Sequence, residues 1–432
     1  MASERVLVGP YEVLVWPDRL GSVGVARHDV TFEQFPVKTE SVTSLSHEAR
    51  ILHTVSGGIG MPLLHWFGAV DGTDIMVIDS YGSCLEETFC QSGRYFSLQM
   101  LLCLAEQLLS RVEFIHSRNI IHGNLSPWSF ALGSLDWQNR QVFLVDFNTV
   151  VASKTTAHGD LYAIAQILSY FYRGGDSWEK HQQKPRCGID KESPPVLIDF
   201  FREISLCKEK SPNYDDLKDI FRAALQDMAT QLAIALDLKG PRNITSELLP
   251  KIEVFQAMTS GSLFDTLNLK LSQAGQGMEK PIATLPRRNL LGLLELFDDI
   301  LRIYMVLLLR DRLSCQKVPQ VLRAYHLPNK LWRDLYWFLN SIGDEGDGLS
   351  NSFKCAFTER AYKYISTLYE SFPCYQPYWT ELLLALACRM HGLGSEYDKL
   401  VWTQNVFYWK GQIKGAKAQC EVSKISVSGS SF

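Results

Sequence analysis

The chain has 432 residues, of which 46% are hydrophobic and 21% charged, and its formal net charge is −4. This length predicts two or three domains with a substantial core, and the small net charge gives no electrostatic basis for binding nucleic acid or an acidic membrane. Ten cysteines are scattered without C-x-x-C pairs, which argues against a zinc ribbon or a disulfide scaffold and favours free thiols.

No targeting or membrane signal is found along the chain. Residues 1–5 begin no secretory signal, and the apolar run at 303–309 is far shorter than the roughly 20 residues that cross a bilayer. We therefore expect a cytoplasmic or nuclear protein without a membrane anchor.

Six motifs follow one another in order through the first half of the chain. These motifs are the segments 57–62 with 66–68, 81–89, 110–117, 122–129 with 145–148, 159–174 and 212–217. They resemble segments of the casein kinase I family of protein kinases, and the resemblance covers about residues 10 to 225. A single turn of this kind would carry little weight, whereas six in order make the resemblance specific.

The resemblance implies an α+β protein-kinase-like bilobal fold for residues 1–228, with a small lobe at about 1–79 and a large lobe at about 80–228. Residues 229–420 match no family that we recognise, and their pattern predicts an all-α C-terminal domain. Residues 421–432 are expected to be a disordered tail.

The motif at 122–129 resembles a kinase catalytic loop from which the reactive groups are missing. A kinase uses an Asp as base, a Lys on the γ-phosphate and an Asn on the metal. Here Asn124, Ser126 and Ser129 stand at those three positions, while His122 is kept and Gly123 replaces an arginine. Losing a positioned base alone costs roughly 10² to 10⁴-fold in rate, so the resemblance implies a pseudokinase.

The next motif keeps one metal-binding group. Asp146 matches the metal-binding Asp of the family, but Asn148 replaces the glycine that follows it. Only residues 149–159 separate Asn148 from Asp160, so the family's substrate platform is predicted to be missing. We expect no metal site, or a weak one through Asp146.

A vestigial nucleotide pocket is also implied by the resemblance. Lys38 matches the lysine that reaches the α- and β-phosphates, and Glu48 matches its partner. The same pair could equally be an ion pair that ties a helix to a sheet. No cofactor is required on this view, and ATP with Mg²⁺ would bind weakly. The other positions that match the pocket are Gly21, Gly24, Ile78, Asp79 and Tyr81; the two glycines are as compatible with an ordinary hairpin turn.

The second half of the chain has helical periodicity and many aromatic residues. Apolar residues recur at three- and four-residue steps in 289–313, 317–339, 357–369, 378–390 and 398–409, and residues 275–286 are typical of a linker. Most of the aromatic residues are expected to be core. Trp402 and Trp409, near the chain end, are the candidates for an interface with a partner.

Three functions remain open from the sequence. The first is a catalytically inactive scaffold or allosteric regulator that binds partner proteins, an active kinase being one candidate. The second is an atypical, slow nucleotide-dependent phosphotransferase that uses Lys38, Glu48 and Asp146. The third is a structural subunit whose kinase-like half acts only as a rigid spacer.

Overall fold

The computed structural model forms two compact units that interleave along the sequence. Unit 1 contains residues 1–14, 26–34 and 247–432, and unit 2 contains residues 15–25 and 35–246. The structure describes residues 6–17, 23–40, 44–135, 137–147, 156–175, 177–206, 212–236, 260–278, 287–314, 327–342, 348–394 and 396–428.

A six-stranded sheet has the order β1-β2-β3-β4-β6-β5. Strand β6 is its most buried strand, with residues 75–78 all buried, because Ile, Met and Val fill both faces of an interior strand. It pairs antiparallel with β4 and β5. The strands are β1 (Leu7–Val8), β2 (Tyr11–Val15), β3 (Val23–His28), β4 (Gln34–Glu40), β5 (Leu64–Val70) and β6 (Thr73–Ile78).

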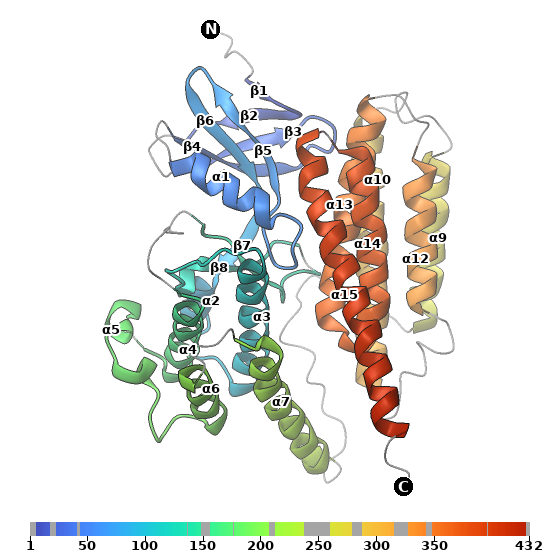
Figure 1. Ribbon diagram of the computed structural model, residues 1–432. Coiled ribbons are helices and arrows are strands. Elements are labelled where there is room, and N and C mark those ends of the chain that lie inside the picture. Colours follow the sequence, from blue (N-terminus) through green and yellow to red (C-terminus); the bar gives the residue numbers. More distant parts are fainter. Residues whose placement is uncertain are drawn as a thin grey trace. The chain divides into compact units, whose positions relative to one another are not determined.

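Unit 2 adds a second, three-stranded sheet and a set of helices to its part of the chain (Figure 1). Helix α3 buries one of its sides: Ser97 caps its N-terminus, and the buried side is apolar except for Arg111 and extends to Ile115. The elements are α1 (Ser44–Val55), β7 (Tyr81–Cys84), α2 (Leu85–Gln91), α3 (Leu98–Ser117), η1 (Pro127–Ser129), β8 (Phe130–Gly133), β9 (Val142–Leu144), α4 (Ala157–Arg173), α5 (Trp178–Gln182), η2 (Pro185–Gly188), α6 (Pro195–Leu206) and α7 (Tyr214–Leu236).

Unit 1 contains the helices of the second half of the chain, which confirms the helical character predicted there (Figure 1). Phe297, Phe338 and Phe357 form the centre of its core, with ring centroids 4.7–5.0 Å apart. No helix among the described residues is both long enough and apolar enough to cross a membrane. The elements are α9 (Ser260–Met278), α10 (Arg287–Ser314), α12 (Leu327–Ser341), α13 (Gly348–Ser371), η4 (Pro373–Tyr375), α14 (Gln376–Leu393) and α15 (Glu396–Ser428).

Two predicted segment boundaries differ from the structure. Residues 275–278, predicted to begin a linker, continue helix α9, which ends at Met278. The rest of that predicted linker, 279–286, lies outside the described residues. Helix α15 continues to Ser428, into the segment predicted to be a disordered tail.

Unit 1 also contains the N-terminal hairpin, which comes from the other end of the chain. The guanidinium of Arg360, on α13, bonds the carboxylate of Glu33, and its Nε lies 3.5 Å from Oδ1 of Asp298 on α10. Both partners are needed because the Arg360 side chain is only 9% exposed, and a buried charge is costly unless it is paired. Asp29 N–H, just after β3, donates to the Pro10 carbonyl in the turn between β1 and β2 at 2.8 Å and joins these two segments of the unit.

The predicted fold class is wrong. A protein-kinase-like bilobal fold followed by a separate all-α domain would keep residues 1–79 together as a small lobe. The structure instead has a six-stranded sheet, and it groups residues 1–14 and 26–34 with the helices of 247–432. The reason is physical: ion pairs and apolar faces join segments that are far apart in the sequence, and local motifs carry no information about such pairings.

Candidate functional site

The candidate site lies in unit 2, where the loop 122–129 passes between helix α3 and strand β8. Gly123 has φ +77°, a left-handed conformation that a side chain would strain, so the glycine is required by the backbone of the loop. Asn124, at the position predicted for the missing base, is exposed to solvent. The neighbouring Leu125 is 2% exposed and fixes the loop to the core.

The carboxylate of Asp160 holds this loop in place. It lies in the first turn of α4, is 1% exposed, and accepts the backbone N–H groups of His122 and Gly123, each at 2.8 Å. His116, on α3, is the third partner of this carboxylate: its Nε2 lies 2.8 Å from Oδ2 of Asp160. The other ring nitrogen of His116, Nδ1, bonds the Tyr214 hydroxyl. We call Asp160 with these partners the Asp160 hub. Its bonds satisfy a buried charge, which is what permits the charge to be there.

His122 is a structural residue rather than a proton donor to solvent. Its Nε2 donates to the carbonyl of Asp146 at 2.6 Å, and its Nδ1 accepts from Asn124 N–H at 3.4 Å. One nitrogen therefore donates and the other accepts, as in a neutral imidazole. Burial lowers the pKa of His122 below its ordinary value, which agrees with the neutral form.

Ser126 and Ser129 bond to each other. Ser126 N–H donates to Ser129 Oγ at 3.1 Å, Ser129 N–H donates to the Ser126 carbonyl at 3.0 Å, and the two hydroxyls lie 3.2 Å apart. Together they cap the short helix η1, and Ser129 is fully buried. At the positions of the family's lysine and metal-binding asparagine, the chain therefore has a turn that stabilises its own backbone.

Lys38 and Glu48 do come together. Nζ of Lys38, on β4, lies 2.7 Å from Oε1 of Glu48, on α1, and their side chains are 23% and 1% exposed. The sequence left two roles open for this pair, a nucleotide contact and a tie between sheet and helix. The ion pair between strand β4 and helix α1 is present in the structure, whereas the nucleotide contact stays a prediction.

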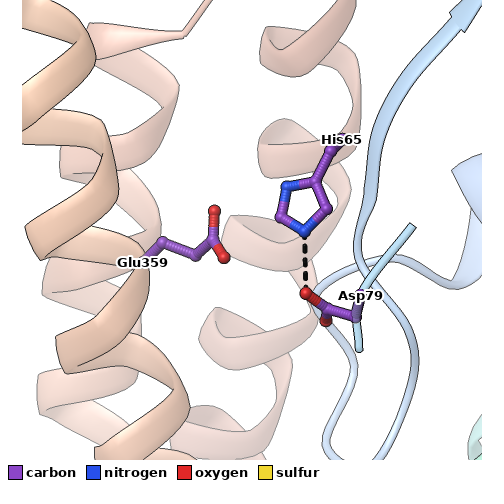
Figure 2. A group of neighbouring side chains, drawn as sticks. All are labelled: His65, Asp79 and Glu359. Carbon is purple, nitrogen blue, oxygen red and sulfur yellow. Dashed lines mark hydrogen bonds and ion pairs between the residues drawn. The ribbon is translucent and has the colours of Figure 1, made fainter. Parts of the chain in front are cut away.

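The predicted hinge residues have structural partners of their own. Asp79, which follows β6, accepts the backbone N–H of Leu63 at 3.0 Å with one carboxylate oxygen. Its other carboxylate oxygen bonds His65 Nε2 at 2.7 Å, as Figure 2 shows. Ile78 is 7% exposed. The Tyr81 ring packs on Phe143 with centroids 5.2 Å apart. Asp79 thus anchors the start of β5.

Of the two glycines in the predicted phosphate loop, the structure describes only Gly24. A Cβ on Gly24 would stand 2.3 Å from the Val15 carbonyl oxygen and 2.8 Å from Pro17 Cδ, so this glycine is explained by the close approach of two chain segments. Gly21 lies outside the described residues, as does Asn148. Asp146 is half-buried, and its backbone carbonyl holds His122.

Trp402 and Trp409, predicted to be interface residues, lie in the core of unit 1. They are 4% and 0% exposed. Trp409 Nε1 donates to the Tyr362 hydroxyl at 2.9 Å, and the Trp402 ring packs edge-on to the Tyr362 ring at 5.0 Å. Indoles buried in this way hold α15 to α13, so this part of the site prediction is corrected.

Unit 1 has other aromatic residues that, unlike Trp402 and Trp409, are exposed to solvent. Tyr336 and Trp337, on α12, are 54% and 40% exposed, and Phe407 on α15 is 69% exposed. The sequence contains a signal that separates them. Trp402, Asn405 and Trp409 are spaced by three and four residues and share one helix face, whereas Phe407 falls off that face.

A scan against models of protein families found no match to this chain. The resemblance to the casein kinase I family therefore rests on the motifs alone.

Proposed function

We propose that the chain is a catalytically inactive protein that binds partner proteins, as a scaffold or as an allosteric regulator of a partner such as an active kinase. The observation that supports this is the state of the loop 122–129. Asn124 has no basic group to offer, and the hydroxyls of Ser126 and Ser129 bond each other and cap η1. A general base must reach its proton in a suitable protonation state, and none of these side chains meets that requirement. We keep the relationship to the casein kinase I family as a proposal about motifs, independent of fold.

The experiment that tests inactivity is incorporation of the γ-phosphate of ATP into generic kinase substrates and into the chain itself. We expect no signal above background, either for the natural chain or for Asn124→Asp, because the missing groups act as a unit. Robust transfer by the natural chain that disappears in Asp146→Ala would refute the proposal.

Partner binding is tested separately. The tagged chain is expressed in cells of the organism that makes it and is purified by affinity. We expect it to recover a reproducible set of proteins. A matched purification with Trp409→Ala, which removes a core side chain of unit 1, tests whether recovery of the partners depends on an intact unit 1. Recovery of nothing beyond background by the full chain would contradict the proposed role.

The second candidate, a slow nucleotide-dependent phosphotransferase, is favoured by one observation, the Lys38–Glu48 pair at 2.7 Å. Such a pair orients phosphates in nucleotide-binding enzymes. Weak ATP and Mg²⁺ binding through Lys38 and Asp146 would then raise the unfolding temperature in proportion to RT ln(1 + [L]/Kd). We expect a marginal shift at millimolar ATP. A large Mg²⁺-dependent shift at sub-millimolar ATP, absent in Lys38→Ala, would favour this second function.

A further inference from the structure

Helix α12 in unit 1 has two sides of different character. Its inner side is buried, with Leu331, Leu335 and Phe338 between 0% and 1% exposed. Its outer side is partly or fully exposed, although it carries large aromatic rings. We call this outer side the α12 face, and it consists of Trp332, Arg333, Tyr336, Trp337 and Asn340.

The aromatic rings of the α12 face are held in position although they are exposed. The rings of Trp332 and Tyr336 lie with their centroids 5.8 Å apart. The Trp337 ring rests on Gly275 of α9, 3.6 Å from where a Cβ of that residue would stand, and α9 lies beside α12 in Figure 1. Rings that are ordered before binding lose little entropy when a partner covers them, and Trp and Tyr are the residues most often found as interface anchors.

Two arginines, Arg333 on α12 and Arg389 on α14, lie close to these rings. The Arg333 side chain is 74% exposed, and its nearest carboxylate, Asp334, lies 3.7 Å away and already bonds Lys330 at 2.5 Å. Arg389 of α14 donates to Asn340 Oδ1 at 2.7 Å and to the Leu339 carbonyl at 2.5 Å.

Arg389 has no carboxylate partner among the described residues. Its Nη1 and Nη2 both donate to neutral oxygens, so within the described part of the chain the charge of this half-buried guanidinium is not balanced by an ion pair. Burial lowers the pKa of Arg389 from its ordinary value, so a carboxylate brought beside it would stabilise its charge.

We propose that the α12 face, with Arg389 beside it, docks an acidic and apolar segment of a partner protein, in which apolar side chains cover the aromatic rings and carboxylates meet Arg333 and Arg389. This inference rests on the proposed protein-binding function and assigns it a surface. Charge complementarity selects the occupant, because a basic segment would meet two arginines with like charge.

The test is selection of peptides from a displayed random library against the full-length chain, followed by titration of labelled selected peptides in fluorescence anisotropy. We expect the selected peptides to be acidic, with Leu, Phe or Trp at three- and four-residue spacing. Arg333→Glu and Tyr336→Ala should each weaken their binding by roughly tenfold or more. Binding should also weaken as salt rises, because exposed charges are screened.

Matched control variants come from elsewhere on the surface. Arg202, with a 62% exposed side chain and an Asp at i−3, is the control for charge reversal as Arg202→Glu, and Phe407→Ala is the control for loss of an exposed ring. Both should change the binding constant less than about twofold. Selected peptides that are basic, or that bind the α12 variants as well as the natural chain, would refute the proposal.

Two further outcomes separate this inference from the proposed function. If the full-length chain recovers the same cellular partners with and without Tyr336→Ala and Arg333→Glu, partner binding stands and the α12 face is the wrong surface. If the chain instead forms a concentration-dependent dimer in size-exclusion chromatography that Tyr336→Ala abolishes, the occupant is a second copy, and the acidic-partner proposal fails.

Discussion

The Asp160 hub of unit 2 and the α12 face of unit 1 use polar and aromatic side chains in opposite ways. At the hub, a carboxylate that is 1% exposed bonds two backbone N–H groups and an imidazole. At the α12 face, the Arg333 side chain is 74% exposed and Tyr336 is 54% exposed. The hub satisfies its polar groups internally, whereas the α12 face leaves positive charge and apolar surface available to another molecule.

This difference shows how buried polar groups and exposed groups of one molecule can be told apart by their effects on stability and on binding. Groups that are fully bonded inside the fold contribute to stability, and changing them should alter the free energy of unfolding. Groups left exposed contribute little to stability, and changing them should alter binding.

The largest effect is expected at Trp409, whose indole is 0% exposed and donates to the Tyr362 hydroxyl. Trp409→Ala leaves a cavity and removes the hydrogen bond to the Tyr362 hydroxyl, which should lower the free energy of unfolding by about 3–5 kcal/mol. Urea unfolding followed by circular dichroism measures it. Phe407→Ala, two positions away and 69% exposed, should stay within about 0.5 kcal/mol. Equal effects of the two changes would mean that α15 is not packed as described.

Next in size is Asp160→Asn. The substitution keeps the shape of the side chain but places an amide N–H₂ against a backbone N–H donor, so one bond of the hub is lost and a donor is left buried. We expect a loss of roughly 3 kcal/mol in the free energy of unfolding. Asp219, an acid with a 67% exposed side chain that pairs with Arg222, is the control. For Asp219→Asn the expected change is below about 0.5 kcal/mol, and a hub variant as stable as this control would contradict the role of Asp160.

The pH dependence of unit 2 should come in part from His181. This side chain is 1% exposed, and burial lowers its pKa to about 4. In the unfolded chain the imidazole of His181 becomes protonated below about pH 6.5. In the folded chain the same imidazole stays neutral until the pH falls to about 4. Stability should be unaffected above pH 6.5 and should fall between pH 6.5 and 4, by on the order of 2 kcal/mol.

Chemical denaturation at several pH values checks this. In His181→Gln the slope of stability against pH between 6.5 and 4 should be flatter than in the natural chain. An unchanged slope would show that other groups titrate in this window and that His181 is not protected from protonation.

The smallest effect on stability is expected for Tyr336→Ala on the α12 face. Because the ring is 54% exposed, the free energy of unfolding should change by less than about 0.5 kcal/mol, although peptide binding should fall. A thermal melt beside the binding titration separates the two. A loss of about 2 kcal/mol or more would place Tyr336 among the core residues and remove the contrast with the hub.

Local features of this molecule could be predicted from its sequence. The apolar steps of 289–313 correspond to helix α10, and those of 398–409 lie within α15, because a helix facing a core repeats every three to four residues. Lys38 and Glu48 also meet as predicted, since they belong to a strand and a helix that follow one another closely.

Features that depend on distant parts of the chain could not be predicted. The pairing of Glu33 with Arg360 joins positions 327 residues apart, and no local pattern encodes it. The same limit explains the fold class, since unit 1 draws on both halves of the sequence. Trp402 and Trp409 were placed at an interface because they are near the chain end, although their shared helix face with Asn405 indicates the core.

The pairing of Glu33 with Arg360 also has a consequence for how the chain is made. Glu33 leaves the ribosome 327 positions before Arg360, which at typical rates of synthesis is an interval of roughly 15–65 seconds. The strand residues Val8, Tyr11 and Val13, each less than 9% exposed in the finished protein, are made long before the described helices of unit 1, the first of which begins at Ser260. These strand residues are therefore expected to be exposed on the growing chain, where chaperones can bind them.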